Sequence, residues 1–201
     1  MKSLQTPTND LLDEYIAKFN NDERYYLADQ AIIKLFEAFP ENKQLEDILL
    51  KISVINDLYS TNIFGTFIMA KHIQGLDIDK DLETGNPDLV NKIASGHEIR
   101  SNKTNKEINF YSFATKYCNW HNRDDYAIYD SFVEKVLLAY KKRDNFSEFK
   151  KGELKDFRKF KSVIMDFADF YNLTRRNLKE IDKFLWVVGK EMFSTNYGRS
   201  D

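Results

Sequence analysis

Cysteine, proline, glycine and long apolar runs are all scarce in this chain of 201 residues. The single cysteine, Cys118, excludes an intramolecular disulfide and favours a reducing compartment. No apolar run approaches the roughly eighteen residues that a membrane-spanning helix needs. The N-terminus also lacks the basic and then apolar pattern of a secretory signal. We therefore expect a cytoplasmic protein that does not enter a membrane.

Sharp catalytic and cofactor motifs are missing as well. The sequence contains no glycine-rich phosphate loop, no Gly-x-Ser-x-Gly turn and no kinase signature. One cysteine cannot supply a four-thiolate iron–sulfur cluster. Cys118-x-x-His121 resembles half of a zinc site, but no second pair supplies the other ligands. We expect neither a metal nor a cofactor.

Helical periodicity runs along nearly the whole sequence. Apolar residues recur every three or four positions, as in Leu27, Ala31, Leu35 and Phe39, and no alternating run of β-branched residues occurs. Only three prolines and seven glycines interrupt the pattern. The sequence therefore predicts an all-α fold.

One predicted helix combines an aromatic face with a lysine. Thr104-x-x-Glu107 has the form of a capping box and predicts the start of a helix that continues through Lys116 and Trp120. A lysine beside an apolar stripe has a partly desolvated amine, which lowers its pKa and leaves some neutral nucleophile near pH 7. The alternative is an ordinary lysine whose stem lies along apolar surface while its amine stays in water.

A carboxylate follows fourteen residues after this lysine. Asp130 stands before an apolar helical stripe, at the N-cap position where aspartate is preferred. The helix dipole keeps such a carboxylate ionised, so that it can face a developing positive charge. Capping alone also explains the residue. Because an amine and a fixed carboxylate suffice for amine nucleophilic catalysis, Lys116 and Asp130 are the candidate catalytic residues.

Two other segments carry candidate nucleic-acid contacts. Tyr59-Ser-Thr-Asn-Ile63 interrupts a helical pattern, and Ser60 and Asn62 within it are placed to contact a flipped nucleotide or to fill the gap that it leaves; helix capping is the simpler interpretation. Residues 141–161 contain nine basic and four acidic residues, a net charge of +5. Such a stripe can follow a phosphate backbone, although a solvated face of an amphipathic helix with its loop is the simpler interpretation. Its candidate contacts are Lys141, Lys142 and Arg143.

On these residues the chain resembles the helix-hairpin-helix DNA glycosylase superfamily, which includes endonuclease III and the 8-oxoguanine DNA glycosylases. Thr115-Lys-Tyr-Cys-Asn-Trp120 and Ala127-Ile-Tyr-Asp-Ser-Phe-Val133 are similar to the lysine and aspartate blocks of that superfamily. The missing cysteine quartet favours its cluster-free 8-oxoguanine branch. The chain departs from the pattern in two respects: the glycine-rich hairpin before the lysine is absent, and the interval from lysine to aspartate is a few residues shorter.

The resemblance implies a fold, an activity and a partner. The fold would be a single all-α domain over residues 1–201 with two lobes around a cleft, a glycosylase-like region over about 45–140 and basic C-terminal helices over 141–197. The activity would be excision of a damaged base such as 8-oxoguanine from double-stranded DNA, with or without strand cleavage, by a monomer. Residues that would contact the DNA or the flipped base include Phe113, Trp120 and His121. The alternatives are a non-catalytic nucleic-acid-binding module and a protein-interaction module.

Overall fold

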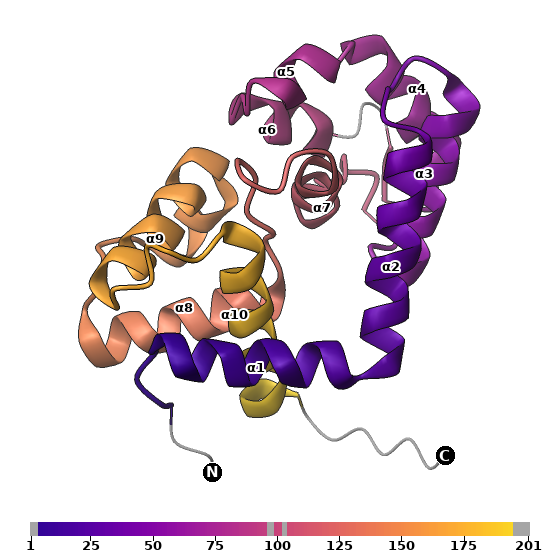
Figure 1. Cartoon of the computed structure of the whole chain (residues 1–201). Coiled ribbons are helices and arrows are strands. Elements are labelled where there is room, and N and C mark those ends of the chain that lie inside the picture. Colours follow the sequence, from indigo (N-terminus) through magenta and orange to yellow (C-terminus); the bar gives the residue numbers. More distant parts are fainter. Residues whose placement is uncertain (1–3, 96–98, 102–103, 195–201) are drawn as a thin grey trace.

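Helices account for all the regular structure in the part of the chain that the computed structural model describes, which is residues 4–95, 99–101 and 104–194 (Figure 1). The predicted all-α class is confirmed. No helix within these ranges is both long enough and apolar enough to cross a membrane. In chain order the helices are α1 (Asn9–Asn21), α2 (Glu23–Ala38), α3 (Leu45–Leu58), α4 (Thr66–Leu76), α5 (Asp79–Glu83), α6 (Asp88–Ala94), α7 (Tyr111–His121), α8 (Ser131–Asp144), the 3-10 helix η1 (Lys151–Lys155), α9 (Phe157–Phe170) and α10 (Leu178–Phe193).

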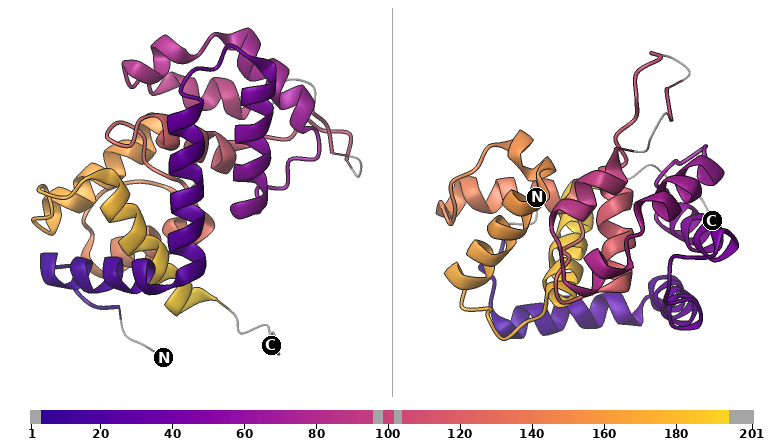
Figure 2. Two further views of the ribbon diagram at one scale, coloured as in Figure 1. Left: turned by 45° about the vertical axis from the view of Figure 1, so that its right-hand side comes forward. Right: turned by 90° about the horizontal axis from the view of Figure 1, so that it is seen from above.

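The helices pack around α7, which lies near the centre of the molecule (Figure 1). Helix α3 packs against α4 and α6 packs against α7, whereas α10 packs against α8 and α1. Two further views show α1 along one edge of the molecule, with α10 beside it (Figure 2). The finer expectation of two lobes around a cleft stays a prediction.

Helix α7 is enclosed by protein on almost every side. Of its eleven residues, all except Ser112 and His121 are buried. A helix that is apolar or buried all round belongs to a core rather than to a surface. The lysine on this helix is therefore an interior residue, and the interpretation of Lys116 as an ordinary surface lysine does not hold.

The predicted cap of the following helix is confirmed. Asp130 has extended backbone angles (φ −140°, ψ 157°), and its side chain accepts a hydrogen bond from the backbone N–H of Phe132. This is the geometry of an N-cap, in which a side-chain oxygen satisfies an N–H that has no partner within the helix. The cap fixes the rotamer of the carboxylate at the first turn of α8.

The predicted capping box at Thr104 and Glu107 is wrong, because α7 begins only at Tyr111. Glu107 instead forms an antiparallel bridge with Arg100, and its carboxylate pairs with the Arg100 guanidinium at 3.3 Å. The described part of this segment projects from the body of the molecule (Figure 2). The start of α7 is set by Asn109, whose side-chain oxygen accepts the N–H of Tyr111 at 3.0 Å.

Candidate active site

Three oxygen atoms hold the amine of Lys116 inside the protein. The residue is only 2% exposed. Its Nζ donates to Ser112 Oγ at 2.6 Å and to the carbonyl oxygens of Ser112 and Tyr129, each at 3.3 Å. The ring centroid of Tyr59 lies 5.4 Å from Nζ, within cation–π range. The amine is therefore confined to one position by hydrogen bonds and by an aromatic ring.

Asp130 provides a carboxylate that lines the same pocket as this amine. Its Oδ1 accepts the Phe132 N–H at 2.7 Å. Burial lowers the pKa of the Lys116 ammonium, and Asp130 is the group that opposes this shift most. A lowered pKa increases the neutral fraction of the amine, which is its nucleophilic form. The two predicted catalytic residues thus line the same pocket.

Polar side chains of α7 tie the segment before Asp130 to the helix. Ser112 Oγ donates to the Tyr129 carbonyl at 3.1 Å, and Thr115 Oγ1 accepts the Tyr129 N–H at 3.1 Å. One turn further on, Asn119 Nδ2 donates to the Tyr126 carbonyl at 2.5 Å. Residues three and four positions apart lie on the same side of a helix, so these three side chains form one polar strip. The strip fixes the position of Asp130 relative to Lys116.

The pocket is small and has aromatic walls. Its volume is about 100 Å³, well under the roughly 300–1,000 Å³ of typical ligand sites. Such a space is too small for a whole nucleotide cofactor. Helices α1, α2, α3, α7 and α10 contribute to the lining, which contains the aromatic side chains of Phe19, Tyr25, Tyr59 and Trp186.

A second carboxyl group, that of Asp182 on α10, also lines the pocket. Its Oδ1 is buried and has no hydrogen-bond partner among the described residues, while its Oδ2 lies 3.8 Å from Lys179 Nζ. Burial raises the pKa of Asp182 to about 6, and the charges of Lys179 and Lys116 oppose the rise. A buried polar atom without a partner is unusual in a native protein and calls for an explanation. Asp182 is the one such residue in the lining of this pocket among the described residues.

The two predicted aromatic contacts do not line this pocket. Phe113 is 1% exposed and packs against Tyr117, with ring centroids 5.6 Å apart. Trp120 is also buried, and both Arg123 and Lys179 lie within cation–π distance of its ring. Both aromatic residues belong to the core around α7.

Ser60 and Asn62 do not line the Lys116 pocket. Both are exposed and have left-handed backbone angles (φ 49° and 57°). They line a separate hollow at the end of α3, and Asn62 Nδ2 donates to the Ser60 carbonyl at 3.0 Å. The two residues that precede them, Leu58 and Tyr59, do line the Lys116 pocket. The Lys116 pocket and this hollow share no lining residue.

The basic residues at the end of α8 are separate from the pocket, and two of the three are engaged in local bonds. Lys141 Nζ donates to Glu148 at 3.2 Å and to the Phe149 carbonyl at 2.6 Å. Arg143 bonds Asp144 and the carbonyl of Leu4. Lys142 is exposed. None of the three lines the Lys116 pocket.

His121 belongs to a second buried polar cluster, built around Lys51. Lys51 is fully buried and donates to the carbonyls of Phe39 and Glu41 and to Asn42 Oδ1, at 2.8 to 3.1 Å. Its Nζ lies 3.4 Å from His121 Nε2. Burial lowers the pKa of Lys51 to about 8. Burial, and then the charge of Lys51, lower the pKa of His121 to about 3.

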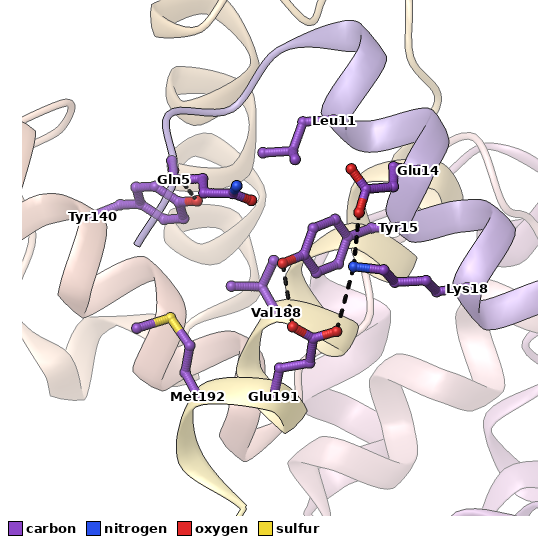
Figure 3. A pocket seen from close by; sticks show the side chains of 9 residues that line it. All are labelled: Gln5, Leu11, Glu14, Tyr15, Lys18, Tyr140, Val188, Glu191 and Met192. Carbon is purple, nitrogen blue, oxygen red and sulfur yellow. Dashed lines mark hydrogen bonds and ion pairs between the residues drawn. The ribbon is translucent and has the colours of Figure 1, made fainter. Parts of the chain in front are cut away.

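A larger pocket of about 340 Å³ lies between α1, α8 and α10 (Figure 3). Lys18 lies between two carboxylates in it, 2.9 Å from Glu14 and 3.5 Å from Glu191, and the Tyr15 hydroxyl donates to Glu191 at 3.4 Å. These groups satisfy one another, and no side chain there resembles an activated nucleophile. The smaller pocket is the one that contains the buried amine of Lys116 and the carboxylate of Asp130, the two candidate catalytic groups.

Comparison with known proteins places the chain in a family. Residues 11–125 match the family model HI_0787_N, which describes an N-terminal domain. The chain belongs to the HI_0787_N family. A Haemophilus influenzae protein described as uncharacterized is 48% identical over 150 residues, which cover 74% of this chain and 69% of that protein. No solved structure matches. The HI_0787_N match includes Lys116 and ends before Asp130, so the pocket draws on residues from both sides of that boundary.

The residues that sequence reasoning missed come mainly from the two ends of the chain. Phe19 and Tyr25 lie around the junction of α1 and α2, and Asp182 and Trp186 lie on α10. One signal was present: Lys179, Asp182 and Trp186 are three and four residues apart, so two charged groups share a helix face with a tryptophan. Nothing in the sequence indicates that this face meets Lys116.

Proposed function

We propose that this chain is a DNA base-excision glycosylase in which Lys116 is the amine nucleophile and Asp130 is its electrostatic and proton partner. The observation that carries the proposal is the convergence of a buried amine and a capped carboxylate on one aromatic-walled pocket. The substrate is a damaged base such as 8-oxoguanine, rotated out of double-stranded DNA into the pocket. The enzyme acts as a monomer in the cytoplasm, where its single buried cysteine stays reduced.

The chemistry follows from the two groups. The neutral Lys116 amine attacks the anomeric carbon of the sugar, the bond from that carbon to the base breaks, and the base leaves with the electron pair and takes up a proton. Asp130 stabilises the positive charge that develops on the sugar and accepts the proton that the attacking nitrogen loses. Opening of the sugar ring yields a Schiff base. β-Elimination from this intermediate then cleaves the DNA strand on the 3′ side.

The other residues that line the pocket are suited to a planar ligand that forms hydrogen bonds, such as a nucleobase. Aromatic side chains provide faces on which a base stacks. The unpartnered Oδ1 of Asp182 is an acceptor for a ring N–H, and a purine offers such donors. The exposed residues Ser60 and Asn62 lie at the end of the junction whose first residues line the pocket, where the strand around a flipped nucleotide would pass.

Borohydride trapping tests the proposal. Wild type is mixed with a duplex oligonucleotide that carries one 8-oxoguanine, and sodium borohydride reduces any Schiff base to a stable protein–DNA adduct. We expect an adduct with wild type, none with Lys116→Gln, and a loss of at least about 10²-fold in rate with Asp130→Asn. Release of the free base, measured in parallel by chromatography, separates excision from reaction at an abasic site that was already present.

Lys179→Gln is the matched control, since it removes another amine from the same pocket. This variant should still form the adduct. An adduct that persists in Lys116→Gln, or that disappears only in Lys179→Gln, would remove Lys116 from the proposed role. Salt-dependent DNA binding without an adduct or base release would instead support a non-catalytic nucleic-acid-binding module.

A further inference from the structure

We infer that Ser112 is a positioning residue that holds the Lys116 amine in the orientation needed for attack, an inference that rests on the proposed function. Ser112 precedes Lys116 by four residues on α7, so the two side chains lie one turn apart on the same face. The distance of 2.6 Å from Lys116 Nζ to Ser112 Oγ is the shortest of the three hydrogen bonds at the amine. The hydroxyl is therefore its principal acceptor.

The direction of the hydroxyl proton is also fixed. Ser112 Oγ lies 3.1 Å from the Tyr129 carbonyl, which can only accept, so the hydroxyl proton points to that oxygen. The lone pairs of Oγ are then left to face Lys116 Nζ. Ser112 thus connects the amine to the segment that ends in Asp130. Its hydroxyl group therefore helps to set the position of the nucleophile relative to the carboxylate.

The number of acceptors determines how the amine can react. The three protons of an ammonium group have three partners here: Ser112 Oγ and two carbonyls. When the ammonium group loses one proton, the neutral amine keeps two protons and gains one lone pair. Two hydrogen bonds then still hold the nitrogen, and the lone pair takes the third direction. Without Ser112 Oγ, the amine would keep only the two longer contacts at 3.3 Å. Its orientation would then be poorly defined.

Removing the hydroxyl should therefore have two opposite effects. The ammonium loses its shortest acceptor, so the amine becomes neutral at a lower pH. The neutral amine is also held less firmly in one orientation, so the rate of adduct formation is lower at a pH where the amine is fully deprotonated. General damage to the fold would lower the rate but would not move the pH midpoint.

Thr115 offers a matched comparison on the same helix. Its hydroxyl donates to the Ser112 carbonyl at 3.0 Å and accepts the Tyr129 N–H at 3.1 Å. Among the described residues it makes no hydrogen bond to Lys116. Thr115→Val therefore disturbs the same helix–loop contact without removing an acceptor from the amine.

Two measurements over a range of pH test the inference in wild type, Ser112→Ala, Ser112→Thr and Thr115→Val. The first is the rate of borohydride-trapped adduct on the 8-oxoguanine duplex. The second needs no DNA: cyanate carbamylates neutral amines, and mass spectrometry of a digest gives the extent of modification at Lys116 at each pH. Thermal melting confirms that each variant is folded.

For Ser112→Ala we expect both midpoints to fall by about 1 pH unit, and the adduct rate at high pH to fall by about ten- to a hundredfold. Ser112→Thr, which restores a hydroxyl, should return both values towards wild type. Thr115→Val should keep the wild-type midpoint. A Ser112→Ala midpoint equal to that of wild type, or an equal shift in Thr115→Val, would overturn the inference. If wild type forms no adduct, the proposed function fails, and the cyanate midpoints still decide whether Ser112 holds the amine.

Discussion

His121 makes the free energy of unfolding of the protein depend on pH. Its Nε2 lies 3.4 Å from Lys51 Nζ and 3.3 Å from Asn42 Nδ2, and both of these nitrogens are donors. The ring nitrogen between them must therefore be an acceptor, and a proton placed on it would face two donors and a buried positive charge. Burial, and then the positive charge of Lys51, lower the pKa of His121 from 6.5 to about 3 in the folded protein.

The sign of the effect follows from proton binding. Between pH 6.5 and pH 3 the unfolded chain binds a proton at His121 and the folded chain does not, so the free energy of unfolding decreases as the pH falls through this range. At 1.36 kcal/mol per pKa unit, the loss between pH 7 and pH 5 is about 2 kcal/mol. Below pH 3 the loss stops growing.

Urea unfolding of wild type and His121→Gln at pH 5, 6, 7 and 8 measures this contribution. Glutamine keeps a polar acceptor near Nε2 but does not titrate. The difference in unfolding free energy between the two proteins should change by about 2 kcal/mol from pH 7 to pH 5 in favour of the variant. Other titrating groups, such as Asp182, are common to both proteins and cancel in the difference. A difference independent of pH would refute the reasoning.

Two other predictions concern the pocket and the helix packing. Asp182→Asn should raise the free energy of unfolding at pH 7 by up to about 3 kcal/mol, because the pKa of Asp182 is raised from 3.8 to about 6 in the folded protein and its ionised form is disfavoured there. The stability gain of the variant over wild type should grow as the pH rises from 4 to 6, opposite in direction to the His121 contribution, and equal urea midpoints for the two proteins at pH 7 would contradict the prediction. Gly189→Ala should lower the melting temperature and cost about 1–3 kcal/mol, since a Cβ there would lie 2.6 Å from Phe132 Cβ and 2.9 Å from its carbonyl oxygen. Gly152→Ala, whose Cβ would meet nothing within 4 Å, is the control and should melt as wild type does.

Local signals in the sequence predicted the cap at Asp130 and the desolvation of Lys116, whereas the catalytic roles of these residues stay predictions. The cap at Asp130 depends on residues within one turn, and its geometry is found as expected. The aromatic residues around Lys116 indicated a desolvated amine, and the lysine is buried. The capping box predicted at Thr104 and Glu107 was wrong because it depends on a contact outside the expected helix. The side chain of Glu107 pairs with Arg100, which precedes that helix.

The walls of the pocket could not be predicted from the sequence. Phe113 and Trp120 were expected to line it, but α7 has protein on nearly all sides, so an aromatic stripe does not show which side faces a cavity. Phe19 and Trp186 are about a hundred and seventy residues apart, and their rings lie in edge contact at 5.8 Å. Only the packing of α1 against α10 brings them together, and that depends on the whole chain.

The burial of α7 bears on how a flipped base would enter the Lys116 pocket in the proposed reaction. A helix embedded in the core exchanges its amide hydrogens only through large openings of the protein, so the amine-bearing helix should be among the last segments to exchange. If a flipped base binds here as we propose, we expect the pocket of about 100 Å³ to widen by movement of the lining residues from α10 and from the junction of α1 and α2, while α7 stays in place. In the proposed reaction, Lys116 Nζ would then keep its position while the pocket lining moves.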